Sequence, residues 1–310
     1  MKAIMYHYVR PEDKNYPYFK FLHINDFKKQ LDFFQDNYTI IHPSEINEKI
    51  GTVTNAMVLT FDDGVKDHYQ YVLPELQRRN IAGIFYISTG VHKTKKLLDV
   101  HRLHMLLGKY GGNTIYSHLL TLVSHDMLTD EHREEFKILT YKTQENDAAT
   151  LAVKRMMNYF ISYNFREAIM DEMMKTFLGD EAAIYAGYYL STDEIKKMHD
   201  AGMVIGSHTV NHPLMSKLPE ELQFFEINES FNFLEQATGG LSFKTFCYPY
   251  GGFHSFTTKT EELLQAAHCV YSFNVEQRDI SLTDLTNRPQ ALPRYDCNYF
   301  PHGKIWVSEN

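Results

Sequence analysis

Short apolar runs alternate with helix-like segments over most of the chain. Eight runs have the length and composition of buried strands and lie at residues 2–6, 39–41, 56–61, 81–87, 203–206, 243–247, 269–273 and 291–294. Six segments between them space apolar residues as a helix does, at residues 25–35, 44–50, 67–79, 191–202, 219–237 and 261–267. This alternation predicts an α/β fold in which helices cover a parallel sheet that is closed, or nearly closed, into a barrel.

One long segment breaks the alternation. Residues 92–190 contain helical patterns but no convincing strand, and their methionine-rich stripe is more typical of a core than of a cofactor site. We therefore predict a barrel built from residues 1–91 and 191–310, interrupted by a helical insertion over residues 92–190. No Pro/Gly/Ser-rich linker marks the edges of the insertion, so we expect it to pack on the barrel.

Composition and charge exclude several classes of protein. With 44% hydrophobic residues among 310, the chain can bury a large core. Its formal net charge of −8 argues against a surface for nucleic acid. The apolar run at residues 81–91 is about half the ~20 residues that a membrane-spanning helix needs. The first ten residues leave no room for the apolar core of a signal peptide, so a cytoplasmic location is expected.

Two adjacent carboxylates follow the predicted strand at residues 56–61. Asp62, Asp63 and Gly64 come where parallel α/β folds assemble their active sites, at the carboxyl end of a strand. Two like charges in such a place are costly unless a cation neutralises them, so one carboxylate could bind a metal while the other acts as a base. The alternative is a structural Asp-Gly turn in which Asp62 caps the next helix.

Two histidines follow a second predicted strand. His208 and His212 are four residues apart, and Pro213 restricts the backbone before it, so both imidazoles could face one cation. Two histidines and one carboxylate leave open positions on zinc, which is the arrangement of a catalytic site. The chain has 16 histidines, so a chance pair of loop histidines is the alternative.

A third strand end carries aromatic residues and glycines. The segment at residues 246–252 could present a backbone N–H to a developing oxyanion. By itself this pattern is also that of an ordinary loop, with Tyr248 and Tyr250 packed on the surface.

Together these segments resemble the signature motifs of the polysaccharide deacetylase family, carbohydrate esterase family 4. The motifs are TFDDG at residues 60–64, HTVNHP at residues 208–213 and YPYG at residues 248–251, in this order and each after a predicted strand. The resemblance covers roughly residues 1–91 and 191–300. It implies a distorted (β/α) barrel, interrupted in this chain by the helical insertion predicted above, and metal-dependent hydrolysis of N-acetyl or O-acetyl groups on sugars.

The resemblance also implies roles for individual residues. Asp62 would be the general base, and the backbone N–H of Tyr250 would support the oxyanion. Asp63, His208 and His212 would bind one divalent metal ion, most often Zn²⁺, with Co²⁺, Ni²⁺ or Mn²⁺ as alternatives.

Two features depart from the common pattern of the family. Cys247 stands where an arginine usually orients the base, and the C-terminal Leu-x-His that usually supplies the acid is absent. The subgroup of poly-N-acetylglucosamine deacetylases shares both features and takes its acid from an N-terminal Met-Tyr-His, which ends here at His7. By this resemblance His7 is the general acid and Arg294 pairs with Asp62. The alternative for His7 is a core histidine bonded to a backbone carbonyl.

The expected function is therefore removal of an acetyl group, most often N-acetyl, from a sugar or glycan, with release of acetate. Two alternatives remain: a catalytically inactive sugar-binding homologue, suggested by Cys247, and a hydrolase of a non-sugar C–N amide bond. A phosphoester hydrolase with two metals would need more ligands than the three found. We expect the insertion to cover the substrate groove, or to make a contact between copies in a homo-oligomer.

Overall fold

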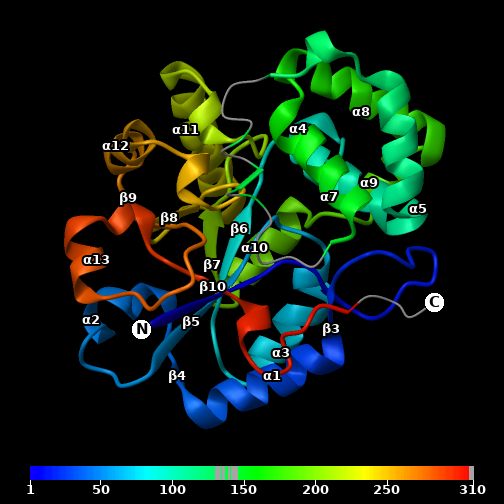
Figure 1. The fold of residues 1–310 in the computed structure, drawn as a ribbon. Coiled ribbons are helices and arrows are strands. Elements are labelled where there is room, and N and C mark those ends of the chain that lie inside the picture. Colours follow the sequence, from blue (N-terminus) through cyan, green and yellow to red (C-terminus); the bar gives the residue numbers. More distant parts are fainter. Residues whose placement is uncertain (130–133, 135–136, 139, 141–145, 307–310) are drawn as a thin grey trace. The chain divides into compact units, whose positions relative to one another are not determined.

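The centre of the fold is a parallel sheet (Figure 1). The computed structural model describes residues 1–129, 134, 137–138, 140 and 146–306, and within them eight strands form this sheet, in the order β10-β1-β5-β6-β7-β8-β9 with β4 beside β5. The strands are β1 (Lys2–Tyr6), β4 (Thr39–Ile40), β5 (Ala56–Phe61), β6 (Ile84–Ile87), β7 (Val204–Ser207), β8 (Lys244–Cys247), β9 (Cys269–Phe273) and β10 (Tyr295–Asp296). The α/β fold predicted from the sequence is confirmed.

The segment from Leu292 to Tyr295 contacts strands near both edges of this sheet, β9 and β1. The N–H of Leu292 donates to the carbonyl of Ser272 (2.8 Å), while Tyr295 of β10 pairs with Ile4 of β1. The strand expected at residues 291–294 is therefore wrong in position, since the paired strand lies at Tyr295–Asp296. Pro293 explains the shift, because proline has no N–H to donate to a strand neighbour.

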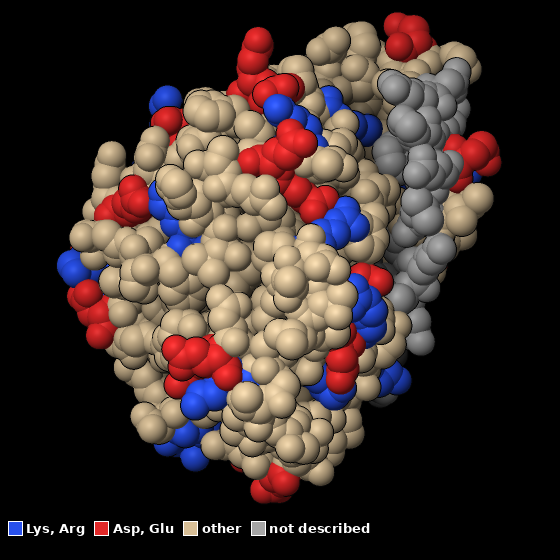
Figure 2. Space-filling model, turned by 90° about the vertical axis from the view of Figure 1, so that its left-hand side faces the viewer, with Lys and Arg blue, Asp and Glu red and all other residues tan. Residues whose placement is uncertain are grey.

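Helices cover the sheet, as the spacing of apolar residues predicts. They are α1 (Ile24–Asn37), α2 (Ile46–Lys49), α3 (Leu73–Arg78), α4 (Val91–Thr94), α10 (Thr192–Asp200), α11 (Glu220–Thr238), α12 (Thr258–Ala266) and α13 (Leu282–Asn287). The helix expected at residues 67–79 begins instead as a π-helix, η2 (His68–Val72), and continues as α3. Acidic and basic side chains are interspersed over the face in Figure 2, so on that face the net charge of −8 is not gathered into one patch.

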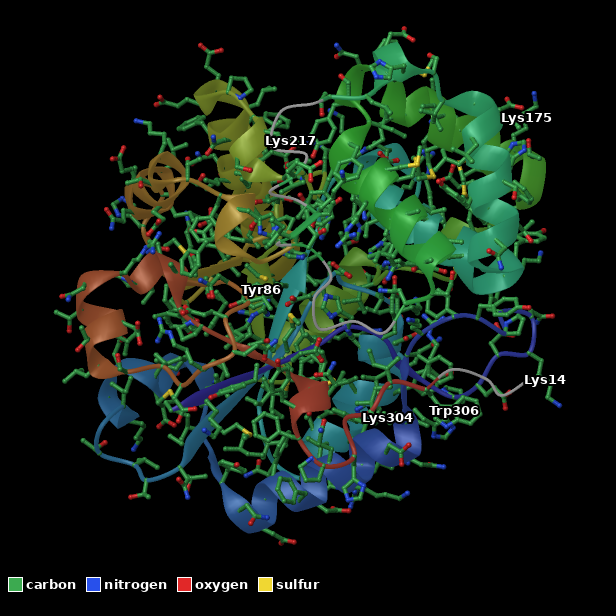
Figure 3. All side chains as sticks on the ribbon, viewed as in Figure 1. Lys14, Tyr86, Lys175, Lys217, Lys304 and Trp306 are labelled. Atoms are coloured by element: carbon green, nitrogen blue, oxygen red, sulfur yellow. The ribbon has the colours of Figure 1, made fainter. Side chains whose placement is uncertain are left out.

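Side chains alternate between two sides of the strands. Along β5, Leu59 and Phe61 join the apolar cluster that also contains residues of α1, whereas Val58 joins a second cluster with residues of β6, β8 and β9. Tyr86 of β6, labelled in Figure 3, belongs to this second cluster, and its hydroxyl is 2.8 Å from Thr245 Oγ1. Because side chains repeat every two residues along a strand, Thr60 and Asp62 continue the face of Val58 toward the carboxyl end of β5.

The chain divides into two compact units. The first comprises Met1–Pro11, Phe21–Lys95 and Gly187–Trp306, and the second includes Glu12–Lys20 and Lys96–Ala186. The expected boundaries at residues 92 and 190 therefore differ from the observed ones by a few residues, and Glu12–Lys20 joins the helical unit. The packing of the insertion on the barrel stays a prediction.

The second unit is helical in its described residues. Its α-helices are α5 (Asp99–Leu122), α7 (Ala148–Arg155), α8 (Tyr163–Phe177) and α9 (Glu181–Tyr185), and α5 packs against α7 and α8. Met170, Met173 and Met174 of α8 are buried, so the methionine stripe belongs to the core of this unit. In the described part of the chain, every helix is too short or too polar to cross a bilayer.

Candidate active site

The motif residues of the first unit gather at one edge of the sheet. Asp62 and Asp63 follow β5, His208 and His212 follow β7, and Tyr250 follows β8. Since these strands are parallel, their carboxyl ends meet at the same edge, where α/β folds bind ligands. His7 follows β1 and lies at this edge as well. Arg294 precedes β10, at the amino end of that strand, and joins the group through its side chain, which binds Asp62.

Asp63, His208 and His212 form a three-ligand set. Oδ1 of Asp63 lies 3.3 Å from Nε2 of His208 and 3.5 Å from Nε2 of His212, and all three side chains are buried. Their ligand atoms lie within 4.8 Å of one another. One carboxylate and two imidazoles fit a divalent cation of the zinc type and leave positions for water or substrate. The residues present therefore fit the metal that the sequence motifs imply.

The orientation of His208 favours the same conclusion. Its Nδ1 is 2.7 Å from the carbonyl of Cys247, and because a carbonyl only accepts, Nδ1 carries the proton. Nε2 is then the nitrogen that faces Asp63 and would bind a metal, as in metal-binding histidines whose other nitrogen is held by a backbone carbonyl. Burial opposes a positive charge on His208, but Cys247 and the carboxylate of Asp63 outweigh it and raise its pKa well above the ordinary value. The surroundings of His208 therefore favour positive charge at this place, whether on the protonated ring or on a bound metal ion.

Asp62, His208 and Cys247 also have ligand atoms within 4.8 Å of one another. The carboxylate of Asp62 is already bound by Arg294, however, and the Nδ1–H of His208 is bound by a carbonyl. The first set is therefore the better metal site.

The backbone of the site is unusual at several positions. Asp63, Thr209, His212 and Tyr250 have positive φ values of 80°, 66°, 56° and 63°. Such conformations are uncommon outside glycine and cost about 1–3 kcal/mol each, so surrounding contacts must hold them. They concentrate at functional sites, and here each belongs to one of the three motifs.

Glu226 of α11 supplies such contacts for the loop between the two histidines. Its Oε2 accepts the N–H groups of Val210 (2.7 Å) and Asn211 (2.8 Å), and its Oε1 accepts the side-chain amide of Asn211 (2.7 Å). Burial raises the pKa of Glu226 on balance. Glu226 is not among the residues predicted from the motifs, although a glutamate on the buried face of a predicted helix was a signal for it.

Asp62 forms a buried ion pair with Arg294. The two guanidinium Nη atoms donate to the two carboxylate oxygens at 2.8 Å each, and the side chains are 3% and 1% exposed. Burial raises the pKa of Asp62, but Arg294 outweighs it and lowers the pKa on balance. Asp62 is therefore ionised at neutral pH and fixed in orientation.

Cys247 lies against this pair. Nη2 of Arg294 donates to its Sγ at 2.9 Å, and Sγ lies 3.5 Å from Oδ2 of Asp62. Burial raises the pKa of the thiol, which keeps it neutral. The guanidinium missing at position 247 is thus supplied from position 294.

His7 approaches the other side of Asp62. Its Nε2 is 4.0 Å from Oδ2 of Asp62, and its side chain is 42% exposed. This exposure contradicts the alternative of a core histidine. A histidine of that kind is present instead at position 68, where Nε2 of the buried ring is 2.8 Å from the carbonyl of His7.

The two tyrosines of the third motif differ in their surroundings. The ring of Tyr250 lies 5.0 Å from that of His212, beside the three-ligand set. Tyr248 is buried, stacks on Phe256 at 3.8 Å and donates to the carbonyl of Gln290, so the alternative of a surface position is wrong for it. The role of the Tyr250 N–H stays a prediction.

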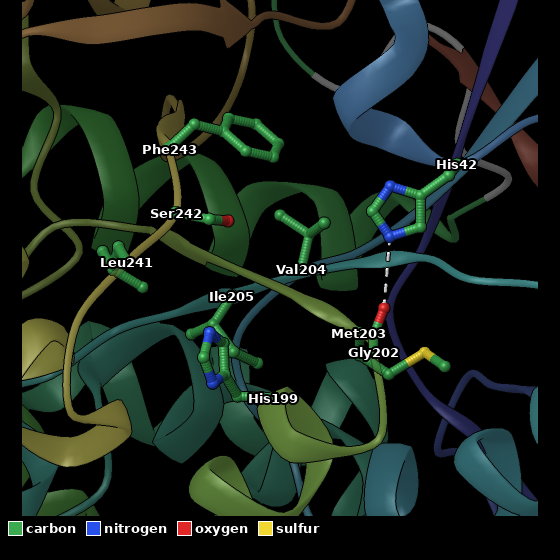
Figure 4. A pocket seen from close by; sticks show the side chains of 9 residues that line it. All are labelled: His42, His199, Gly202, Met203, Val204, Ile205, Leu241, Ser242 and Phe243. Atoms are coloured by element: carbon green, nitrogen blue, oxygen red, sulfur yellow. Dashed lines mark hydrogen bonds between the residues drawn. The ribbon is translucent and has the colours of Figure 1, made fainter.

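A hollow of about 130 Å³ lies elsewhere in the first unit (Figure 4). It is lined by His42, His199, residues 202–205 and residues 241–243. These residues surround the amino ends of β7 and β8, whereas the three-ligand set lies at the carboxyl ends. The hollow is therefore distinct from the candidate active site.

Comparison with protein families gives a match over part of the chain. Residues 172–269 match the model of the family described as polysaccharide deacetylase. This stretch contains His208, His212 and Tyr250, while Asp62 and Asp63 precede it. No curated protein sequence is significantly similar to the chain.

Several solved structures share the fold. They include the deacetylase PplD of Streptococcus pyogenes in complex with acetate (14% identity, 100% of this chain and 98% of that chain, TM-score 0.61) and IcaB from Ammonifex degensii (17%, 94% and 89%, 0.55). A de-N-acetylase from Aggregatibacter actinomycetemcomitans is a third (14%, 94% and 93%, 0.54). At these identities the likeness establishes the fold, a distorted (β/α) barrel with helices around a parallel sheet.

Proposed function

We propose that this chain, whose residues 172–269 match the polysaccharide deacetylase family, is a metal-dependent hydrolase that removes N-acetyl groups from a sugar or glycan and releases acetate. One observation carries the proposal. A buried three-ligand set lies next to a carboxylate that an arginine keeps ionised, and an exposed histidine stands 4.0 Å from that carboxylate. Amide hydrolysis needs these groups together: a cation site, a base and an acid.

The metal would be held by Asp63, His208 and His212. Zn²⁺ is the preferred ion, although Co²⁺, Ni²⁺ or Mn²⁺ would suit the same donors. When bound, the metal supplies Lewis acidity toward the acetyl carbonyl and makes water more acidic. The Nδ1–H of His208, bound by the carbonyl of Cys247, keeps the ligand nitrogen oriented. Glu226 holds the loop that carries His212.

Asp62 would accept the proton of the attacking water. Its low pKa makes it a weak base, but the bidentate contact with Arg294 keeps it ionised and holds its orientation. His7 would donate a proton to the leaving nitrogen, since its imidazole is exposed to substrate and close to Asp62. The N–H of Tyr250, beside His212, would support the oxyanion.

The arginine next to the base weighs against an inactive homologue. That alternative arose because Cys247 replaces the usual arginine. Arg294, which directly precedes β10, nevertheless binds the carboxylate of Asp62 and contacts Cys247. The same pairing supports a likeness to the poly-N-acetylglucosamine deacetylase subgroup. A cytoplasmic location, and a homo-oligomeric contact through the helical insertion, stay predictions.

Acetate release from a panel of N-acetylated sugars, O-acetylated sugars and non-sugar acetamides tests the proposal, with Asp62→Asn as the matched control. This control removes the base but leaves all three ligands of the metal set. We expect the parent to release acetate from at least one N-acetylated substrate and Asp62→Asn to release almost none. Equal rates for the parent and the variant would contradict the role of Asp62. Release from a non-sugar amide alone would favour the other alternative.

A further inference from the structure

The carbonyl of His7 is bound by a buried histidine from another element, and we propose that this residue, His68, is a positioning residue for the general acid. The inference rests on the proposed function, in which His7 protonates the leaving group. His68 acts through the backbone carbonyl of His7 rather than through its imidazole.

The contact is short and enclosed. Nε2 of His68 is 2.8 Å from the carbonyl oxygen of His7, and the His68 ring is fully buried. The rings of Phe61 and Phe85 lie 5.7 and 5.6 Å from it. A carbonyl only accepts, so Nε2 carries the proton. Burial also lowers the pKa of His68 to about 4, which keeps the ring neutral and its tautomer fixed at neutral pH.

The backbone of His7 needs such a donor. The strand pairing of β1 ends at Tyr6, whose carbonyl accepts the N–H of Asp62 at 2.9 Å, and β2 (Val9–Arg10) begins two residues after His7. His7 therefore lies in the gap between two strands. Because its imidazole is 42% exposed, the surrounding core does not fix the ring. Its direction depends on the backbone, which His68 holds.

His68 belongs to the same short segment of the chain as the base, Asp62. It opens the π-helix η2, five residues after the metal-set carboxylate Asp63. Single turns of π-helix are rare and frequently occur at functional sites. One short segment thus places the base Asp62, a metal ligand and the anchor of the acid. This coupling fixes the acid and the base relative to each other.

A purely structural role explains the choice of histidine less well. Nδ1 of His68 is buried and has no hydrogen-bond partner among the described residues. Burying an unpaired polar atom is unfavourable, so packing alone would favour an apolar ring of similar size at this position. Histidine keeps one useful group there, the N–H toward His7.

Two variants separate positioning from packing. His68→Phe keeps a ring of similar size but removes the donor, whereas His68→Gln keeps an N–H donor in a similar place. Each is assayed on two substrates: an N-acetylated sugar, whose amine needs a proton to leave, and an aryl acetate, whose phenolate leaves without one. A misplaced acid slows only the first reaction, because the base and the metal set serve both.

We expect His68→Phe to lower kcat on the N-acetylated sugar by at least about tenfold, with little change in KM. Its kcat on the aryl acetate should stay within about twofold of the parent value. His68→Gln should recover most of the loss. The ratio of the two rates is measured in one sample, so a fraction of unfolded protein does not affect it.

Two results would overturn the inference while leaving the proposed function in place. One is an equal loss on both substrates in His68→Phe, and the other is no loss on either. A metal-loaded parent that cleaves neither substrate would contradict the proposed function and the inference together. The melting temperature of each variant, measured by circular dichroism, checks that the fold is retained.

Discussion

Replacing Arg294 with methionine tests how the base is held. Arg294 and Asp62 are both buried, and the guanidinium makes two 2.8 Å hydrogen bonds to the carboxylate. Methionine keeps part of the aliphatic volume but leaves the carboxylate without its counter-ion. Removing one partner of a buried ion pair costs about 3–5 kcal/mol, because the remaining charge stays desolvated. We expect the free energy of unfolding at pH 7 to fall by this amount.

The loss of unfolding free energy caused by Arg294→Met should become smaller as pH falls. In the parent, Arg294 lowers the pKa of Asp62, so the pair stabilises the fold above the pKa of an unfolded aspartate and less as pH falls. Without Arg294 the pKa of Asp62 rises, and the carboxyl group is protonated at higher pH. The stability difference between parent and variant should therefore shrink as pH is lowered from 7 to about 4, near the ordinary carboxyl pKa. The acidic limb of the activity profile should move to higher pH.

A surface pair provides the matched control. Arg278 makes a similar bidentate contact with Asp284, at 2.8 and 2.9 Å, but its side chain is 41% exposed. Arg278→Met should cost only about 0–1 kcal/mol, because exposed pairs are screened by solvent. The double variant Asp62→Asn/Arg294→Met removes both buried charges and should recover much of the loss.

Urea unfolding, followed by circular dichroism, measures these free energies. A loss of stability in Arg294→Met no larger than that in Arg278→Met at pH 7 would refute the role of the buried ion pair. A loss that stayed the same between pH 7 and pH 4 would also refute it.

Other substitutions give simpler outcomes. His208→Ala removes one of three ligands, so zinc bound per chain, measured by mass spectrometry, should fall from one to near zero; full retention would contradict the metal site. Asp62→Asn should lower kcat by about 10²- to 10⁴-fold with zinc content unchanged, and loss of zinc would place Asp62 among the ligands. A Cβ on Gly206 would lie 2.5 Å from the ring of Tyr86, so Gly206→Ala should cost about 1–3 kcal/mol. Gly187→Ala, in open space, should leave the melting temperature nearly unchanged.

Much of the fold could be predicted because buried parallel strands have a strong local signal. The apolar runs at residues 2–6, 56–61 and 269–273 coincide with β1, β5 and β9. The run at residues 291–294 misled, since composition suggested a strand where Pro293 prevents regular pairing. The π-turn at His68–Val72 could not be predicted, because hydrophobic spacing does not distinguish it from an α-helix.

The residues of the candidate site also differ in how well the sequence predicts them. Asp63, His208 and His212 each follow a strand closely, so parallel topology alone brings them together. Glu226 and His68 act from helices, and their contacts depend on how each helix packs. Such contacts depend on tertiary geometry, so the sequence offered only a weak signal for Glu226, a glutamate on the buried face of a predicted helix, and none for His68.

A zinc titration of acetate release tests the central claim most directly. The protein is stripped of metal, zinc is added in fractions of an equivalent, and acetate release from an N-acetylated sugar is followed. We predict almost no activity without metal and a linear rise that ends at one equivalent per chain, as the single set of Asp63, His208 and His212 requires. Undiminished acetate release by the metal-free protein would contradict the account, as would a rise that continues to two equivalents.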